Sequence, residues 1–396
     1  MNQRQIFLQH IAQTSPEPVG LEIIKANGIY QYDTTGKAYI DLISGFSVAN
    51  IGHSNPKVVE AVQKQAAEYM HLIVYGEFIE TPQVAYAKLL TDYLPPTLNS
   101  VYFTNSGAEA TEGAMKLAKR VMERSKIIAF NNSYHGSTQG ALSIMGSEYW
   151  RNAFRPLLPG VYHFDYGSEE VIEAIDSSTC CVILETVQAE SGVTKPSIEW
   201  MQALRKKCNE HSVLLILDEI QAGFGRTGTL WAFEQFDIVP DILLLGKALG
   251  GGMPLGAFIA DRKLMNALTH HPVLGHITTF GGHPVSCAAG KAAFEVLVEG
   301  NYIADVKNKE QIILKHINHS KIKRIKSCGL WASLEFDSFE TNKKVIDRCI
   351  EKGLITDWFL FAPECLRIGP PLIITDEELI KVCLLINEAI DEAFSC

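Results

Sequence analysis

The sequence predicts an α/β fold, in which a large domain carries a mostly parallel sheet covered by helices and is joined to a smaller α+β domain. Nearly continuous apolar runs, such as Cys180–Glu185, Val213–Glu219 and Asp241–Gly246, alternate with segments of helical spacing. Strands without a polar face are typical of parallel sheets that helices cover on both sides. After about residue 295 the pattern changes to shorter mixed pieces, such as "GLWASLEF" and "CLRIGPPL", which predict the smaller domain.

The expected elements follow in chain order. Gly28–Leu42 predicts a β-hairpin with its turn at Asp33–Gly36. Helical spacing follows in "PKVVEAVQKQAAEYM" and "QVAYAKLLTDYL", and a strand over Ser100–Thr104 then runs into a helix near "NSGAEA". Lys126–Phe130 is the next strand, and "KHINHSKIKRIK" indicates a solvated face followed by a strand. We expect three parts, which are an N-terminal segment that packs with the small domain (residues 1–45), the large domain (46–295) and the C-terminal small domain (296–396).

Composition excludes several classes of protein. The 396 residues are 47% hydrophobic and 20% charged, the balance of a globular protein with a large core, and the net charge of −10 argues against nucleic-acid binding as the main function. The nine cysteines form no C-x-x-C pair, which favours reduced thiols in a cytoplasmic protein over a disulfide framework or a metal site. The N-terminus lacks the apolar core of a signal peptide, and no apolar run reaches the roughly 18 residues of a membrane span.

A single lysine, Lys247, stands between the apolar runs Leu243–Leu245 and Leu255–Ala260. Burying an ammonium group is costly unless the group is paired or neutral. Either Lys247 reaches solvent at the end of a strand, or it is a desolvated amine held for covalent chemistry with a carbonyl. Ligands of open α/β sheets bind beyond the carboxyl ends of the strands, which is where this lysine falls.

The segment "TNSGAEATEG" offers a site for an anion. Ser106, Gly107 and Ala108 place backbone N–H groups with little side-chain bulk at the start of a helix, an arrangement suited to a phosphate. The alternative is a purely structural capping box between Ser106 and Glu109.

Further polar and aromatic residues follow neighbouring strands. Asp218 and Glu219 end an apolar strand, where they could cap a loop or pair with a cationic ring nitrogen, and Gln221 could donate to a neighbouring ring oxygen. Tyr134 or His135 could stack on a planar ligand, although packing is the commoner role of such residues. A phosphate cradle, a stacking aromatic, an acid for a ring nitrogen and a sequestered lysine are together what pyridoxal phosphate requires.

Several longer motifs carry a resemblance to a known family. They are "GHSNP", "NSGAEA", "YHG", "ETVQAESG", "LDEIQAGFGRTG", "GKALGGGMPLGA", "TTFGGHP" and "LRIGPPL". In this order and over nearly the whole chain, they make the sequence resemble the class III pyridoxal-phosphate aminotransferases. This fold-type-I group includes ornithine, acetylornithine and 4-aminobutyrate aminotransferases.

The resemblance implies roles for individual residues around pyridoxal phosphate in the large domain. Lys247 corresponds to the Schiff-base lysine and Asp218 to the partner of the pyridinium nitrogen, so that these two are the implied catalytic residues. The implied cofactor-binding set comprises these two residues and Ser106, Gly107, Ala108 (phosphate), Tyr134 (ring stacking), Ile220 (opposite face), Gln221 (ring oxygen), His135, Glu185 and Thr279. Thr279 matches a threonine that completes the phosphate site of the neighbouring subunit, which implies an obligate homodimer.

The resemblance also implies substrate-binding residues. Glu190 and Arg367 match a pair in which the arginine binds a substrate carboxylate and the glutamate masks it when an amine-bearing side chain enters. Two positions depart from the family: Ser137 replaces the usual arginine after "YHG", and Phe46 replaces the tyrosine of ornithine aminotransferase. Both changes remove groups that would hold a distal carboxylate. Other residues could replace that clamp, namely Arg151, Arg155 and Tyr75.

The expected function is therefore an aminotransferase that moves an amino group from an amino acid or ω-amine donor to a 2-oxo acid such as 2-oxoglutarate, by a ping-pong mechanism. The resemblance implies an acetylornithine- or ornithine-like donor, and the apolar distal positions favour an ω-amino acid or simple amine. The alternatives are a decarboxylating transaminase, a racemase or an aminomutase on the same fold. A protein of another class, which binds the cofactor without catalysis, is disfavoured by the intact Lys247 and Asp218.

Overall fold

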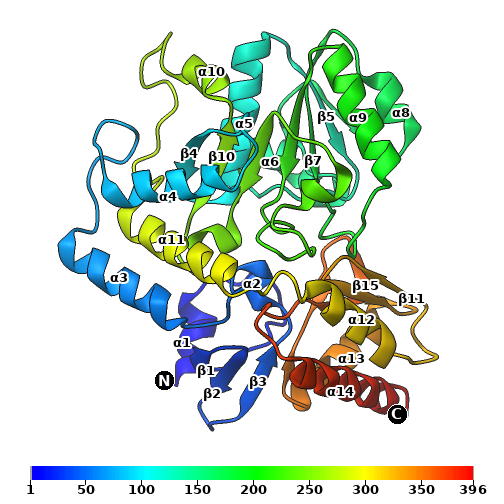
Figure 1. Cartoon of the computed structure of the whole chain (residues 1–396). Helices are drawn as coiled ribbons and strands as arrows, with labels where there is room; N and C mark the ends of the chain where they lie inside the picture. Colours follow the sequence, from blue (N-terminus) through cyan, green and yellow to red (C-terminus); the bar gives the residue numbers. More distant parts are fainter. Residues whose placement is uncertain (1, 396) are drawn as a thin grey trace.

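A seven-stranded sheet forms the centre of the computed structural model, which describes residues 2–395 (Figure 1). Its strands are β4 (Ser100–Thr104), β5 (Lys126–Phe130), β6 (Val161–Phe164), β7 (Thr179–Glu185), β8 (Leu214–Asp218), β9 (Ile242–Leu245) and β10 (Gly256–Ala260). The strand order is β4-β10-β9-β8-β7-β5-β6, and β10 runs antiparallel to both of its neighbours while the other pairs are parallel. The expected mostly parallel sheet is confirmed, with β10 as its reversed strand.

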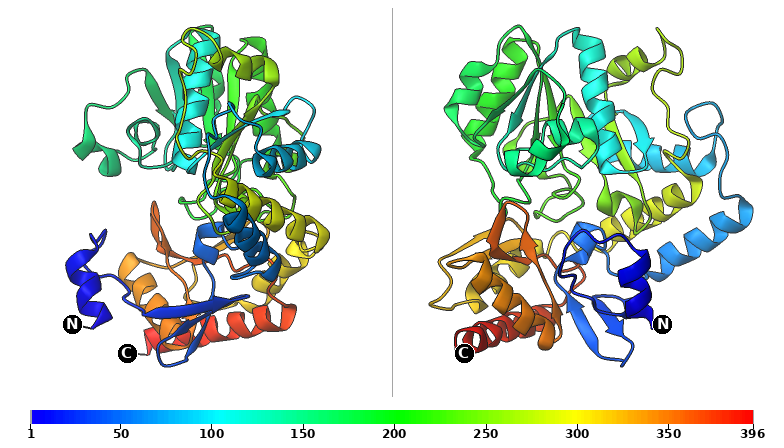
Figure 2. Two further views of the ribbon diagram at one scale, coloured as in Figure 1. Left: turned by 90° about the vertical axis from the view of Figure 1, so that its left-hand side faces the viewer. Right: turned by 180° about the vertical axis from the view of Figure 1, so that it is seen from behind.

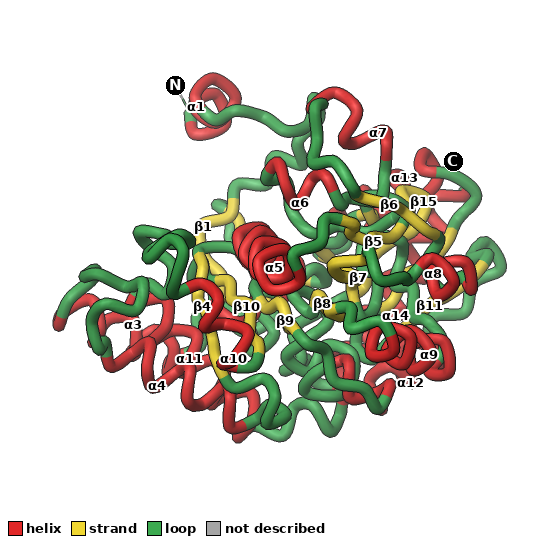
Figure 3. Tube along the Cα trace, turned by 90° about the horizontal axis from the view of Figure 1, so that it is seen from above, coloured by secondary structure: helices red, strands yellow, loops and turns green. Residues whose placement is uncertain are grey.

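Helices cover both faces of this sheet. Every residue of β7, β8 and β9 is buried, which explains why these strands are apolar on both faces. Helix α5 (Gly107–Met122) packs against β10, β9 and β7, and Figure 3 shows α4 (Thr81–Asp92) and α9 (Ile198–Glu210) on the other side of the row of strands. The other elements before residue 300 are α1 (Gln3–His10), α2 (Ser44–Ser47), α3 (Pro56–Glu68), α6 (Gln139–Ser143), α7 (Glu148–Arg151), α8 (Glu169–Ala174), α10 (Arg262–Met265) and α11 (Pro284–Glu299), with the short 3-10 helices η1 (Asn152–Phe154), η2 (Ala232–Phe236), η3 (Lys247–Gly250) and η4 (Asn266–Leu268).

The start of α5 differs from the expected capping box. Ser106 is the N-cap, and its hydroxyl accepts the backbone N–H of Glu109 at 3.2 Å, as expected. The Glu109 carboxylate, however, accepts the backbone N–H of Asn105 at 2.8 Å in place of that of Ser106. Only half of the box is therefore formed, because Glu109 reaches one residue further back.

Two four-stranded sheets form the other half of the molecule. Their strands are β1 (Ile23–Asn27), β2 (Tyr30–Asp33), β3 (Ala38–Asp41) and β13 (Leu354–Ile355) in one sheet, and β11 (Arg324–Ser327), β12 (Ala332–Glu335), β15 (Ala362–Ile368) and β14 (Trp358–Phe359) in the other. Helix α13 (Phe339–Glu351) packs against β15 and β13, and α14 (Asp376–Phe394) packs against both α13 and α12 (Val306–His316). The expected hairpin is present as β2 and β3, with the Asp33 carboxylate accepting backbone N–H groups of Thr35 and Lys37 in its turn.

The first strands join the C-terminal part through β3, which pairs in parallel with β13. Figure 2 shows this arrangement, in which β1–β3 lie in the same half of the molecule as α14. The domain limits at residues 45 and 295 remain a prediction.

Arg226 connects several of these parts through hydrogen bonds. Its fully buried guanidinium donates to the carbonyl oxygens of Leu330 (2.8 Å) and Pro370 (2.7 Å) and to the side chain of Asn50 (2.7 Å). One side chain from the loop after β8 therefore binds the segment at Asn50 and two C-terminal segments, one before β12 and one after β15. Across residues 2–395, no helix is both long enough and apolar enough to cross a membrane.

Candidate active site

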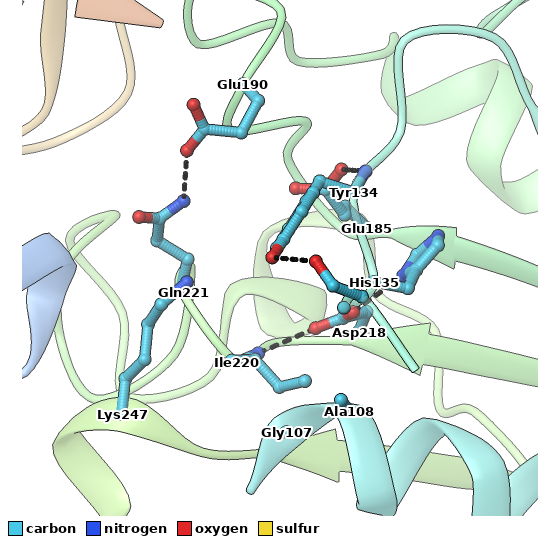
Figure 4. A pocket seen from close by; sticks show the side chains of 12 residues that line it. Gly107, Ala108, Tyr134, His135, Glu185, Glu190, Asp218, Ile220, Gln221 and Lys247 are labelled. Atoms are coloured by element: carbon cyan, nitrogen blue, oxygen red, sulfur yellow. Dashed lines mark hydrogen bonds and ion pairs between the residues drawn. The ribbon is translucent and has the colours of Figure 1, made fainter. Parts of the chain in front are cut away.

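A cavity of about 220 Å³ opens where several strands of the central sheet reach their carboxyl ends. Figure 4 shows residues from the ends of β7, β8 and β9 and from the start of α5 around this space. The predicted site residues that line it are Gly107, Ala108, Tyr134, His135, Ser137, Glu185, Glu190, Asp218, Ile220, Gln221 and Lys247. Gly136, which was not singled out from the sequence, lines it as well.

Asp218 is held by two hydrogen bonds at the end of β8. Its Oδ1 accepts the backbone N–H of Ile220 at 2.9 Å, and its Oδ2 lies 2.7 Å from Nδ1 of the buried His135. Burial lowers the pKa of His135, but the hydrogen bond with Asp218 and the charges of Asp218 and Glu185 together outweigh it, so that the pKa is raised. The histidine and the carboxylate therefore form a buried, mutually oriented pair.

The neighbouring carboxylate, Glu219, points away from the cavity, because successive side chains of a strand face opposite ways. It accepts the backbone N–H groups of Ala232 (2.7 Å) and Phe233 (2.6 Å) and the hydroxyl of Thr186 (3.0 Å). Burial raises the pKa of Glu219 to about 8. Of the two acidic residues that end β8, only Asp218 faces the cavity.

The start of α5 makes a cradle without side-chain bulk. A Cβ on Gly107 would lie 2.7 Å from Cδ1 of Ile220, so any side chain at this position requires Ile220 to shift. Gly136 has φ +124°, and a Cβ there would lie 2.5 Å from Cβ of Ala108. Backbone N–H groups at a helix N-terminus favour an anion, and the residues present therefore fit a phosphate.

Lys247 is the first residue of η3, separated from the end of β9 by one residue, and lies at the opposite side of the cavity from Tyr134 in Figure 4. Its backbone is left-handed, with φ 51°, which is uncommon for a residue with a side chain. Burial lowers the pKa of its ammonium group, although neighbouring carboxylates, Glu190 first among them, oppose that shift. An amine with a lowered pKa is suited to nucleophilic chemistry.

Glu185 positions the segment that carries Tyr134. Its two carboxylate oxygens accept the backbone N–H groups of Tyr134 (3.0 Å) and Ala189 (2.9 Å), and burial raises its pKa to about 7. The hydroxyl of Tyr134 lies 3.2 Å from that of Ser137. Tyr134 is thus held through its backbone N–H by Glu185, and its hydroxyl is contacted by Ser137.

Glu190 and Arg367 form a buried ion pair beside the cavity. Arg367 Nη2 lies 2.9 Å from Glu190 Oε2, and Nη1 lies 3.3 Å from Oε1. The same carboxylate accepts the backbone N–H of Leu360 at 3.0 Å and a long bond from Gln221 at 3.4 Å. Burial would raise the pKa of Glu190, but Arg367 outweighs it, so that the pKa is lowered.

The contacts of Arg367 with Asp357 and Phe359 were not expected from the sequence. Its Nε donates to Asp357 Oδ1 at 2.8 Å, and its guanidinium carbon lies 4.1 Å from the ring centre of Phe359. The same carbon lies 5.1 Å from the ring centre of Phe46. No local sequence signal identifies Asp357 or Phe359, because both reach Arg367 through the pairing of β14 with β15.

The remaining predicted residues do not line this cavity. Ser106 is the N-cap just before the cradle, Arg367 pairs with the cavity-lining Glu190, and Phe46 contacts Arg367. Thr279 lies on an exposed stretch before α11.

The residues considered as a replacement clamp also lie elsewhere. Arg151 is bound by Glu148 (2.8 Å) and lies 2.8 Å from a ring nitrogen of His163, and Arg155 also pairs with Glu148. Tyr75 lines a different cavity.

A largely parallel sheet whose strand ends bring a lysine, a carboxylate and a helix N-terminus to one cavity is the architecture of a pyridoxal-phosphate-dependent transferase. The family model described as "Aminotransferase class-III" matches residues 11–390, and the chain belongs to this family of pyridoxal-phosphate-dependent enzymes.

The names of curated relatives and of a solved structure agree with this assignment. The chain is 37% identical over 386 residues to an acetylornithine aminotransferase of Methanopyrus kandleri, covering 96% of each chain. It is 36% identical over 380 residues to ornithine aminotransferase 1 of Staphylococcus aureus, covering 92% of this chain and 93% of the relative. The solved ornithine aminotransferase of Toxoplasma gondii, described with partial occupancy of the cofactor at its active site, superposes with a TM-score of 0.91 at 30% identity, covering 99% of this chain and 94% of that one.

Proposed function

We propose that this aminotransferase moves an amino group from an amino acid or ω-amine donor to a 2-oxo acid such as 2-oxoglutarate by a ping-pong mechanism. The observation that carries the proposal is the convergence of Lys247, Asp218 and the start of α5 on one cavity. When bound there, pyridoxal phosphate supplies an electron sink for the carbanion at the amine-bearing carbon of the substrate.

Each residue of the cavity has a role in this proposal. The Lys247 amine bonds the cofactor and, once free, moves the proton at the amine-bearing carbon of the substrate. Asp218, oriented by His135, pairs with the cationic ring nitrogen. The other cofactor contacts are Ser106, Gly107 and Ala108 to the phosphate, Tyr134 and Ile220 to the two faces of the ring, Gln221 to the ring oxygen, and Glu185 through the backbone of Tyr134.

Arg367 is the proposed anchor for the carboxylate of the 2-oxo acid. Its Nη1 and Nη2 atoms face Glu190, and this two-pronged edge matches the geometry of a carboxylate. Glu190 stays bound to this edge when the donor has no carboxylate to place on Arg367. The same site can therefore bind the donor in one half-reaction and the 2-oxo acid in the other.

We propose a homodimer in which Thr279 of the partner subunit completes the phosphate site. Exposed apolar side chains on two stretches support a face that is covered in the assembly. They are Leu72, Ile73, Phe78 and Ile79 on one stretch, and Val273, Leu274, Ile277 and Phe280 on the other. The eight cysteines among the described residues are buried free thiols, which supports the proposed cytoplasmic location.

A second candidate concerns the donor. The acetylornithine and ornithine aminotransferases among the relatives favour an α-amino acid with a terminal amine. The cavity favours an ω-amino acid or a simple amine, of the 4-aminobutyrate or β-alanine type, because Ser137 lines it and Arg151 and Arg155 are engaged by Glu148. None of these three residues therefore offers a free guanidinium to a distal carboxylate of the donor.

Half-reaction spectroscopy on the pyridoxal form of the holoenzyme separates these donors. Single amines are mixed with the enzyme, and loss of the resting cofactor absorption is followed for ornithine, N-acetylornithine, 4-aminobutyrate, β-alanine, lysine, glutamate and an aryl amine. Fast conversion by 4-aminobutyrate, β-alanine or the aryl amine, with slow conversion by N-acetylornithine and ornithine, supports the second candidate. The reverse order supports an acetylornithine- or ornithine-type donor, and no conversion by any amine contradicts the aminotransferase.

A further inference from the structure

Arg367 is bound by two carboxylates that come from different parts of the molecule. Glu190 belongs to the loop after β7 of the central sheet, whereas Asp357 belongs to the small sheet, just before β14. The Nη1 and Nη2 atoms of the guanidinium donate to Glu190, and its Nε donates to Asp357 at 2.8 Å. All three side chains are largely buried, so the two ion pairs are protected from solvent screening.

Asp357 and Arg367 form one structural unit. The backbone N–H of Arg367 donates to the carbonyl oxygen of Asp357 at 2.9 Å, and the hydroxyl of Thr356 donates to the carbonyl oxygen of Arg367. Arg367 lies in β15, which pairs with β14 directly after Asp357. The backbone carbonyl of Glu190 accepts the N–H of Phe361 in the β14–β15 turn at 2.9 Å, so the loop of Glu190 is held by the same unit. A rotation of the Glu190 side chain alone can nevertheless break its bonds to Arg367 without disturbing the bond between Asp357 and Nε.

The rest of the guanidinium is restrained by the same region. Its carbon lies 4.1 Å from the ring centre of Phe359 in β14, and Nη2 also donates to the carbonyl oxygen of Trp358 at 3.1 Å. With Nε engaged by Asp357 and the plane restrained by Phe359, the Nη1 and Nη2 edge keeps its direction toward the cavity side. A carboxylate that replaces Glu190 meets a preorganised pair of donors.

The charges give Asp357 a second effect. Burial raises its pKa to about 6, so the group is ionised in a neutral buffer. Its negative charge offsets the positive charge of Arg367 in both states of the site, whether Glu190 or a substrate carboxylate occupies the other edge.

We propose that Asp357 is a positioning residue that fixes the direction in which Arg367 presents its Nη1 and Nη2 edge to the acceptor carboxylate. The inference rests on the proposed function, in which Arg367 binds the acceptor, and it adds the residue that determines how the carboxylate is received.

The direct test is a crystal structure of the wild-type holoenzyme soaked with glutarate, a dicarboxylate that mimics the acceptor without reacting. The expected result is that a glutarate carboxylate lies on the Nη1 and Nη2 edge, that Glu190 has moved away, and that Asp357 remains within hydrogen-bond distance of Nε. Loss of the Asp357 contact, while Glu190 stays bound to Arg367, would overturn the proposal. Glutarate bound elsewhere, with Arg367 uninvolved, would instead overturn the proposed function.

Variants test the same point in solution. Asp357→Ala removes the partner of Nε, and we expect the apparent Kd for 2-oxoglutarate in the acceptor half-reaction to rise by about 10-fold or more. The half-reaction with a simple amine donor should change less than about twofold, and Asp357→Asn, which keeps an oxygen for Nε, should restore most of the acceptor affinity. Glu335→Ala, which breaks a cross-strand pair with Arg324 in the same sheet, is the matched control and should change neither half-reaction.

Each outcome of the variant series has a separate meaning. If Arg367→Lys weakens the binding of 2-oxoglutarate while Asp357→Ala does not, the inference fails and the proposed function stands. If neither substitution changes the Kd for 2-oxoglutarate, the proposed role of Arg367 fails. If Asp357→Ala slows both half-reactions equally, and Asp357→Asn does not rescue, Asp357 is structural and the inference fails.

Discussion

His135 and Asp218 form a buried pair, with Nδ1 of the histidine 2.7 Å from Oδ2 of the aspartate. The second oxygen of Asp218 is bound by the backbone N–H of Ile220. The carboxylate at the end of β8 therefore has a fixed direction before any cofactor arrives, and this relationship gives the first prediction.

His135→Ala is expected to lower both kcat and cofactor affinity by about 10- to 100-fold, because Asp218 loses a charge-assisted hydrogen bond in a buried site. Equilibrium dialysis with pyridoxal phosphate and steady-state kinetics measure the two effects. His163→Ala is the control, since His163 contacts Arg151 outside the cavity. Wild-type kinetics in His135→Ala would show that the direction of Asp218 does not depend on this histidine.

Gly107→Ala is expected to weaken cofactor binding, because the new methyl group would lie 2.7 Å from Cδ1 of Ile220. Overpacking of this kind costs about 1–3 kcal/mol. Ile220→Val removes the clashing methyl group, so the double variant Gly107→Ala/Ile220→Val should regain part of the lost affinity. Cofactor titration of the two single variants and the double variant gives the interaction energy, and strictly additive losses would contradict the predicted contact.

Glu219 is expected to make stability depend on pH. Its pKa is about 8 in the folded protein against an ordinary value of 4.5, so between these values the folded state holds a proton that the unfolded state has released. The contribution of Glu219 to the free energy of unfolding must therefore fall as pH rises through this window. Glu219→Gln removes the titration, and its Tm relative to wild type should rise steadily from about pH 5 to about pH 8.

Glu148→Gln is the control for this experiment, because Arg155 and Arg151 hold the pKa of Glu148 below its ordinary value. Its Tm relative to wild type should stay constant over the same pH range. A constant difference for Glu219→Gln as well would mean that Glu219 is ionised in the folded protein throughout.

Thr279 gives a prediction about assembly. If Lys247 of one subunit and Thr279 of the other build each site, a heterodimer of Lys247→Ala and Thr279→Ala chains contains one intact site. Mixing the two variants under exchange conditions at limiting cofactor should then restore about a quarter of wild-type activity, because about half of the dimers are mixed and each has one intact site of two. Activity equal to the mean of the separate variants would place both residues of a site on one chain.

The residues at strand ends could be predicted from the sequence because their signal is local. Asp218 and Lys247 each follow an apolar run, and the short side chains of Gly107 and Ala108 mark the start of a helix that the next residues continue. A local pattern is enough to place a residue at the carboxyl end of a strand. The family resemblance then supplied roles that the pattern alone left open.

The parts that the sequence did not reveal depend on pairing between distant segments. β10 lies antiparallel between β4 and β9, although β4 precedes it by more than a hundred residues, and no local pattern indicates such an insertion. The contact of Asp357 with Arg367 forms only when β14 and β15 pair in their observed register. The hydrogen bonds of Arg226 form only when three segments distant in the sequence meet. Such contacts follow from tertiary packing, which acts beyond the range of hydrophobic periodicity.

The central claim is that Lys247 bonds the cofactor in this cavity, and the most direct measurement is borohydride reduction of the holoenzyme followed by peptide mass spectrometry. The predicted result is a cofactor adduct on the peptide that contains Lys247, with no adduct on a Lys247→Ala variant that remains folded by its thermal unfolding curve. An adduct on a different lysine, or wild-type turnover by Lys247→Ala, would contradict the account.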